Sequence, residues 1–215
     1  MSSPISPTPD LSATAALVVA GYTGSDPAAV QHHIDELAAI GVPAPTSVPA
    51  YYPLARDLVT SDLAIAVESG YTSGEVEPVL IRVDGNYWLT VGSDHTDRDL
   101  ERTDIARSKA ACPKPIGSMA IALGDAPEVT GWNRIRIRSW VDGDLYQDGT
   151  LAALRPLADT LSRRPAGTEG DLVLFGGTVP LIDGTFRAGA DWRLTLEAPG
   201  CAPLELCYSV KVRNP

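Results

Sequence analysis

The sequence predicts a mainly β fold of the α+β class. Segments with strand character recur along the chain, whereas only two segments have a convincing helical pattern. The 19 glycines and 18 prolines among 215 residues favour many short connections between elements. A chain of this length supports one sizeable core, so we expect a single domain over residues 1–215.

The helix expected over residues 27–40 is the clearest single element. It follows an apolar run, residues 16–20, that predicts a buried strand. Asp26 has a side chain suited to the N-cap, and Pro27 has the restricted φ angle that favours the first helical position. Gly41 is the kind of residue at which helices commonly end.

The remaining elements are expected to be strands and turns, with one further helix over residues 150–163. Residues 1–12 are rich in Ser and Pro and are expected to be ragged. The proline-containing segments 42–49 and 107–117 are expected to lack regular structure. Further strands are expected within 64–89 and over 119–123, 135–141, 172–175, 192–197 and 204–212.

Composition excludes several classes of partner. The formal net charge of −10 argues against binding to nucleic acid or to an anionic membrane. The apolar run 13–20 is too short to span a bilayer and has no basic segment before it. The three cysteines lack metal-ligand spacing, and we expect them to be reduced in a cytoplasmic protein.

Acidic residues gather around a predicted β-hairpin. Glu75 and Glu77 are two residues apart on a strand and therefore project from the same face. If the hairpin turn is Asp84-Gly85, Asp94 lies across from Glu75; if it is Gly85-Asn86, Asp94 lies across from Glu77. Either register places three carboxylates on one face of one hairpin.

Three carboxylates on one face suggest a cation between them. Like charges directly opposite each other destabilise a sheet. Carboxylate oxygens suit a hard divalent ion such as Mg²⁺, Mn²⁺ or Ca²⁺ better than zinc. The alternative is that these residues form the solvated face of an antiparallel sheet.

A second pair of candidate residues lies on the helix expected over 27–40. His33 and Glu36 are three residues apart, so their side chains can touch on the helix surface. A carboxylate that orients an imidazole favours its action as a general base. The alternative is a half-buried histidine beside a solvated glutamate.

Taken in order, these motifs resemble the fumarylacetoacetate hydrolase (FAH) superfamily over about residues 27 to 210. That superfamily has a His-x-x-Glu lid, a Glu-x-Glu pair, an Asn-Asp-x-Thr-x-Arg-Asp segment, a lysine, a Cys-Pro turn and a glycine-rich segment near the C-terminus. The corresponding segments here are His33-Ile34-Asp35-Glu36, Glu75-Val76-Glu77, Ser93-Asp94-His95-Thr96-Asp97-Arg98-Asp99, Arg107-Ser108-Lys109, Cys112-Pro113-Lys114-Pro115-Ile116-Gly117 and the run from Gly170 to Thr178.

The resemblance implies a mixed-β sandwich roll with a short N-terminal lid helix, assembled as a homodimer. It also implies a role for each matched residue. The metal ligands would be Glu75, Glu77 and Asp94, holding Mg²⁺ or Mn²⁺. Lys109 would stabilise an enolate or carbanion, and the His33–Glu36 dyad would activate water or move a proton once the lid closes. Thr178 and the glycines before it, including Gly177, would hold a substrate carboxylate, and Arg98 would hold the acidic groups of the site or a substrate oxyanion.

The activity implied is that of a metal-dependent enzyme that cleaves a carbon–carbon bond of a small oxo acid or β-dicarbonyl, by hydrolysis or decarboxylation. Because the superfamily fold hosts several chemistries, two alternatives stay open. One is a hydratase or tautomerase of an enol or oxo acid at the same site. The other is a non-catalytic, metal-stabilised binding or assembly protein. Ser93 departs from the asparagine of the superfamily pattern, and an extra residue separates the glycines from Pro180.

Overall fold

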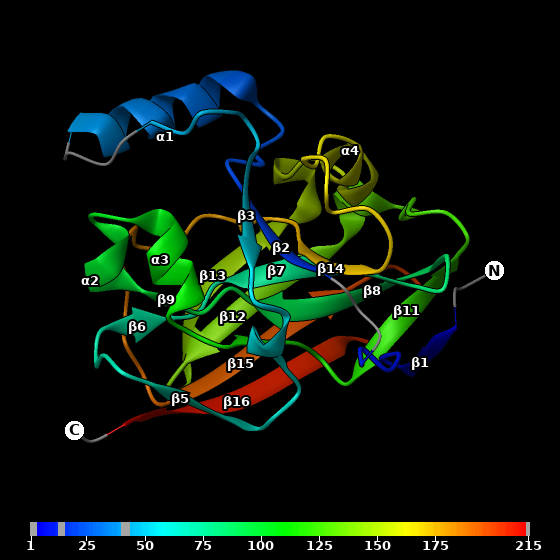
Figure 1. Ribbon diagram of the computed structural model, residues 1–215. Coiled ribbons are helices and arrows are strands. Elements are labelled where there is room, and N and C mark those ends of the chain that lie inside the picture. Colours follow the sequence, from blue (N-terminus) through cyan, green and yellow to red (C-terminus); the bar gives the residue numbers. More distant parts are fainter. Residues whose placement is uncertain (1–3, 13–15, 40–43, 214–215) are drawn as a thin grey trace.

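A computed structural model describes residues 4–12, 16–39 and 44–213 (Figure 1). The strands are β1 (Ile5–Pro7), β2 (Ala16–Gly21), β3 (Ala50–Leu54), β4 (Val59–Thr60), β5 (Ala64–Val67), β6 (Thr72–Ser73), β7 (Val76–Val83), β8 (Asn86–Ser93), β9 (Thr96–Asp97), β10 (Lys114–Pro115), β11 (Met119–Gly124), β12 (Arg136–Val141), β13 (Asp144–Thr150), β14 (Leu172–Phe175), β15 (Asp191–Glu197) and β16 (Leu204–Val212). The α-helices in these ranges are α1 (Pro27–Ala39), α2 (Arg98–Glu101), α3 (Ile105–Ala110) and α4 (Leu157–Ser162), and short 3₁₀ turns cover Arg56–Leu58, Trp132–Arg134 and Leu151–Ala153.

Two larger sheets organise these strands. One has seven strands in the order β1-β11-β8-β7-β14-β2-β3, and the other has five in the order β13-β12-β15-β16-β5. Two-stranded pairs, β10 with β4 and β6 with β9, lie beside them. Both large sheets mix parallel and antiparallel neighbours, as β2 with β14 and β16 with β5 are parallel. The mainly β, mixed-sheet sandwich expected from the sequence is confirmed.

The main core lies between the two sheets. Alternate residues of β7, such as Val76 and Leu80, face Leu194 and other apolar residues of the five-stranded sheet. The intervening residues, Val79 and Ile81, join a second cluster on the other face of the seven-stranded sheet. Glu75 and Glu77 share the second face, because they are four and two residues before Val79, respectively. The candidate site therefore lies on the side of this sheet that faces away from its partner.

The β7–β8 hairpin resolves the choice of register. Val83 pairs with Asn86, and Asp84 and Gly85 both have positive φ angles, 48° and 77°. These angles are typical of the two-residue turns that join antiparallel strands. The pairing continues to Val76 opposite Ser93. Asp94 consequently lies across from Glu75, as the Asp84-Gly85 alternative predicts.

Helix α1 begins as expected. The Asp26 carboxylate accepts a hydrogen bond of 2.9 Å from the Ala28 amide, and the Asp26 carbonyl accepts one from Val30. Val30 and Ile34 are buried and form its apolar side. In Figure 1, α1 lies at the outer edge of the molecule, away from the two sheets. The expected helix end at Ile40 and Gly41 lies outside the described residues.

Three local expectations are wrong. The helix expected over 150–163 is interrupted, since β13 continues to Thr150 and α4 starts only after Pro156, whose ring is incompatible with a helix interior. The segment 107–117 contains the end of α3 and the strand β10, because the prolines fall after the helix and within an extended pair. Residues 1–12 include an ordered strand, β1, which pairs with β11.

No helix of the described ranges is long and apolar enough to cross a membrane.

Candidate active site

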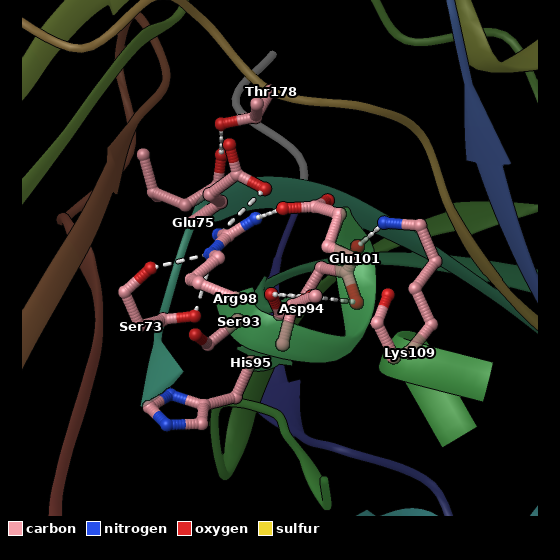
Figure 2. A network of polar contacts seen from close by, with 12 residues as sticks. Ser73, Glu75, Ser93, Asp94, His95, Arg98, Glu101, Lys109 and Thr178 are labelled. Atoms are coloured by element: carbon pink, nitrogen blue, oxygen red, sulfur yellow. Dashed lines mark hydrogen bonds and ion pairs between the residues drawn. The ribbon is translucent and has the colours of Figure 1, made fainter. Parts of the chain in front are cut away.

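The three predicted carboxylates belong to the open end of the β7–β8 hairpin, where Figure 2 shows two of them, Glu75 and Asp94. Glu75 lies just before β7 and Asp94 just after β8, and the Asp94 amide donates a hydrogen bond of 3.1 Å to the Glu75 carbonyl. Glu77 lies two ladder positions further along, in β7, opposite Gly92. Glu77 and Asp94 are buried, whereas the Glu75 side chain is 14% exposed. The hairpin therefore brings together all three residues that the sequence assigns to the metal.

Two short capped helices bring cations to this hairpin end. The Asp97 carboxylate caps α2 by accepting hydrogen bonds from the Asp99 and Leu100 amides. The Asp104 carboxylate caps α3 by accepting one from the Arg107 amide. Because these caps define where each helix starts, they place Arg98 in the first turn of α2 and Lys109 near the end of α3. Both side chains are buried.

Arg98 is bound mainly to groups of its own chain. Its guanidinium contacts Glu75 at 3.1 Å and Glu101 at 2.7 Å, and its Nε donates to the Ser73 hydroxyl at 2.6 Å. The guanidinium carbon also lies 3.7 Å from the centre of the Phe186 ring. Arg98 thus holds two carboxylates in place, and its predicted contact with substrate stays a prediction.

Asp94 is shared by two lysines. Its Oδ2 accepts from Lys109, and its Oδ1 lies 3.1 Å from Lys114 Nζ. Burial acts to raise the pKa of Asp94, but the two ammonium groups outweigh burial and hold this pKa well below its ordinary value. Burial likewise acts to lower the pKa of Lys109, but Asp94 and Glu75 outweigh it and raise that pKa. Lys109 is therefore a cation in this arrangement, suited to stabilising negative charge rather than to acting as a base.

Lys114 was missed by reasoning from the sequence. It lies in β10, which pairs with β4, and its side chain is fully buried with Nζ donating to the His95 carbonyl as well as contacting Asp94. The available signal was a lysine between Pro113 and Pro115 in an otherwise apolar turn. In the sequence, this segment indicates a break in regular structure and matches a Cys-Pro turn, and neither feature assigns a role to Lys114.

Gly177 positions Glu77. The Gly177 amide donates a hydrogen bond of 2.9 Å to Glu77 Oε2. Gly177 has a φ angle of +94°, and a Cβ at this position would lie 1.8 Å from the Thr23 hydroxyl oxygen, so only glycine fits. Burial, followed by the charge of Asp94, raises the pKa of Glu77 well above its ordinary value. The structure thus places Gly177 against a carboxylate of the protein.

The Thr178 hydroxyl is engaged within the chain. Its Oγ1 donates to the Val76 carbonyl at 2.8 Å and accepts from Gln147 Nε2 at 2.7 Å. Because a hydroxyl has one proton to donate, Thr178 would hold a substrate carboxylate through its backbone rather than its side chain. Gln147, from β13, also accepts from the Val76 amide at 2.9 Å. It is a second residue that sequence reasoning missed, since nothing in the sequence pairs β13 with this segment.

Two tyrosines lie close to Lys109 and were also missed. The Tyr52 ring centre is 5.7 Å from Lys109 Nζ. Tyr22 has a φ angle of 55°, unusual for a residue with a side chain, and its pKa is raised by burial and then by the charge of Glu101. Tyr22 directly follows β2, and Tyr52 lies within β3 at the edge of the seven-stranded sheet, where short strand segments gave no signal of a site.

His95 is a structural histidine. Its Nδ1 is 3.0 Å from the Tyr208 hydroxyl and its Nε2 is 2.9 Å from the Thr72 hydroxyl. Burial lowers the pKa of His95 to about 3, so the ring is neutral. The predicted dyad cannot be described in the same way as His95. His33 and Glu36 belong to α1, but their side chains lie outside the described part of the structure. Its role stays a prediction.

Comparison with known proteins places the chain in a family. Residues 20–208 match the family described as protein of unknown function (DUF2848). The chain belongs to the DUF2848 family. No curated protein matches the DUF2848 chain in sequence.

Solved structures show the fold of the DUF2848 chain. 5-Carboxymethyl-2-hydroxymuconate delta-isomerase from Mycobacterium smegmatis is similar at a TM-score of 0.64 and 14% identity, over 93% of this chain and 78% of that one. A protein from Oleispira antarctica, provisionally assigned as a fumarylacetoacetate isomerase/hydrolase, has a TM-score of 0.64 and 16% identity over 92% and 94% of the chains. 2-Keto-3-deoxy-D-arabinonate dehydratase in its apo form has a TM-score of 0.60 and 18% identity over 93% and 74%. The resemblance to the FAH superfamily is confirmed in the fold.

The donor set of the DUF2848 chain fits a hard divalent cation. Glu75, Glu77 and Asp94 supply only carboxylate oxygens, the ligands that Mg²⁺ and Mn²⁺ prefer. In the arrangement described, however, no three or more Asp, Glu, His or Cys residues of the described ranges form a ready metal site. The lysines on Asp94 and the Arg98 contact with Glu75 explain why. A metal ion would have to take the place of Lys109 on Asp94.

Proposed function

We propose that the chain is an FAH-type enzyme that uses Mg²⁺ or Mn²⁺ to cleave a carbon–carbon bond of a small oxo acid or β-dicarbonyl, by hydrolysis or decarboxylation. The observation that carries the proposal is the convergence of Glu75, Glu77 and Asp94 at one hairpin end, with the Lys109 ammonium beside them. A solvated sheet face would not be buried in this way, nor contacted by buried cations.

Each residue of the chain has a distinct part in this proposal. Glu75, Glu77 and Asp94 would hold the cation, which when bound would polarise a substrate carbonyl. Lys109 would leave Asp94 and stabilise the negative charge that develops on the substrate oxygen as the bond breaks. Arg98 and Gly177 would keep Glu75 and Glu77 oriented through the contacts they already make. Thr178 would present its backbone to a substrate carboxylate.

Proton transfer is assigned to the dyad on α1. His33, oriented by Glu36, would activate water for hydrolysis or move a proton to the departing carbon. The dyad would act once α1 approaches the site, so that water is excluded from the reactive intermediate. Tyr22 and Tyr52, which flank Lys109, would form the adjacent wall of the pocket.

A second candidate is hydration or tautomerisation of an enol or oxo acid on the same site. It is favoured by the names of two similar structures, an isomerase and a dehydratase. Replacing His33 with alanine separates the two candidates. Loss of bond cleavage with retained exchange between keto and enol forms supports the second candidate, and loss of both supports the first.

We also propose that the chain acts as a homodimer, as the superfamily resemblance implies. Light scattering coupled to size-exclusion chromatography measures this directly. A non-catalytic, metal-stabilised protein is the remaining alternative.

The test of the proposal is a panel of oxo acids and β-dicarbonyls offered to metal-free and Mn²⁺-loaded protein. The expected result is turnover of at least one compound that requires the metal and is abolished in Glu75→Gln. Full activity in EDTA-treated protein would contradict the metal dependence. Failure of the whole panel in protein with full metal occupancy would favour the non-catalytic alternative.

A further inference from the structure

Lys114 contacts the site but has no part in the chemistry proposed above. Its side chain is completely inaccessible to solvent, although a buried lysine without compensation is strongly unfavourable. Nζ is compensated by Asp94 Oδ1 at 3.1 Å and by the carbonyl oxygen of His95. The buried Lys114 side chain therefore contacts Asp94 at Oδ1, whereas Lys109 contacts the other carboxylate oxygen, Oδ2.

The backbone around Lys114 is held rigidly. Pro115 restricts Lys114 to extended conformations, and Pro113 fixes the preceding φ angle. β10 pairs in parallel with β4, and the Ile116 amide donates to the Thr60 carbonyl at 2.9 Å. In contrast, Lys109 lies near the end of a six-residue helix, with a side chain that is 9% exposed. Of the two lysines, Lys109 is the one that can exchange partners.

The formal charges around the candidate site suggest a role for Lys114. Ion pairs join Glu75, Asp94 and Glu101 to Arg98, Lys109 and Lys114. Glu77 is the fourth carboxylate, near enough to Asp94 and Lys109 for their charges to act on its pKa. Asp97 is separately compensated by the amides at the start of α2. With all four carboxylates ionised, as metal binding to Glu77 would require, the side chains carry a net charge of −1, and a divalent ion would make it +1.

We infer that Lys114 acts as a resident cation that sets this balance, so that the metal-loaded site attracts an anionic, chelating substrate such as a 2-oxo carboxylate. The inference rests on the proposed function. Without Lys114 the loaded site would be formally neutral and would attract an anion less strongly. Lys114 also opposes the incoming metal ion by like-charge repulsion. Metal affinity is lower because of it, and affinity for the anion is higher.

Isothermal titration with Mn²⁺, and then with oxalate on the Mn²⁺-loaded protein, tests the inference without any need for turnover. Oxalate serves as the chelating anion. In Lys114→Met, which keeps the length of the side chain but removes the charge, we expect Mn²⁺ to bind about tenfold more tightly and oxalate about tenfold more weakly. Lys211→Met removes an exposed lysine of β16 and should change neither affinity.

The inference predicts that the affinities for Mn²⁺ and for oxalate change in opposite directions. If both affinities fall together in Lys114→Met, the residue has a structural role only and the inference is overturned. Equal effects in Lys211→Met would also overturn it, because the cause would then be net charge at long range. Wild-type protein that binds no Mn²⁺ would instead contradict the proposed function itself.

Lys114→Gln is a second variant for the case in which Lys114→Met does not fold, since the glutamine amide can still donate to the His95 carbonyl. It should reproduce the shifts of Lys114→Met, and wild-type affinities in this variant would refute the inference. If neither variant folds alone, folding restored by Mn²⁺ supports it, because the ion supplies the missing positive charge. Failure to fold even with Mn²⁺ counts against it.

Discussion

Asp94 lies directly across the hairpin from Glu75, and its amide donates to the Glu75 carbonyl at 3.1 Å. This pairing places two carboxylates side by side where like charges normally destabilise a sheet. Three buried or nearly buried cations of the same chain, Arg98, Lys109 and Lys114, compensate them. The hairpin end is therefore a concentrated charge network, and its members should respond differently to substitution.

Asp94→Asn should destabilise the metal-free protein. It leaves Lys109 and Lys114 buried without their anionic partner, a change that typically costs ~3–5 kcal/mol. Chemical denaturation monitored by tryptophan fluorescence measures the loss. A variant as stable as wild type would show that the two lysines are not bound to Asp94 in solution.

Glu77→Gln should have the opposite effect on the metal-free protein. Burial and the Asp94 charge raise the pKa of Glu77, so its ionised form is unfavourable in the fold. Glutamine keeps an acceptor for the Gly177 amide and removes the charge. We expect unchanged or increased stability by denaturation, with loss of Mn²⁺ binding by titration. A marked fall in stability would contradict the account of Glu77.

Gly177→Ala should be strongly destabilising, by roughly 3 kcal/mol or more, because it combines backbone strain with a steric clash. The φ angle is +94° and the new Cβ would meet the Thr23 hydroxyl. Gly184→Ala is the matched control, since its φ angle is +67° and no atom lies within 4 Å of the new Cβ. It should lose only about 1 kcal/mol. Equal losses would mean that the approach to Thr23 is unimportant.

Gln147→Met should weaken the hydrogen bonds that connect the five-stranded sheet to Val76 and Thr178 beside the site. It removes the acceptor of the Val76 amide and the donor to Thr178, leaving buried polar groups unpaired at a cost of ~2–4 kcal/mol. Hydrogen exchange should then show faster exchange of the Val76 amide, with little change at Val83 at the other end of β7. Unchanged exchange at Val76 would argue against this coupling.

Lys109→Met should separate metal binding from catalysis. Removing the ammonium from Asp94 Oδ2 frees that oxygen, so Mn²⁺ should bind at least as tightly as in wild type. Turnover of any substrate found in the panel should fall by about 10²–10³-fold, because the group that stabilises the developing charge is lost. Weakened Mn²⁺ binding would show that Lys109 supports the metal ligands instead.

Much of the fold could be predicted from the sequence. The apolar strands, the Asp26-Pro27 helix start and the acidic hairpin follow from local signals, and all are present. The helix expected over 150–163 failed because Pro156 was given too little weight against the apolar pattern around it. The capped helices α2 and α3 are too short to show a period.

The candidate site was predicted where its residues are close in sequence. Glu75, Glu77 and Asp94 share one hairpin, so pairing rules were sufficient. Lys114 and Gln147 reach the site through β10 and β13, and only tertiary structure shows that these strands are near. The predicted roles of Gly177 and Thr178 came from a resemblance, which could not show that both residues already bond to this chain.

The most direct test of the central claim is a crystal structure with Mn²⁺ and oxalate, using the anomalous signal of manganese. We predict one manganese ion bound by Glu75, Glu77 and Asp94, with oxalate on the ion and Lys109 moved from Asp94 toward the oxalate. A structure at saturating Mn²⁺ with no ion between these three carboxylates, and with Lys109 still on Asp94, would contradict it.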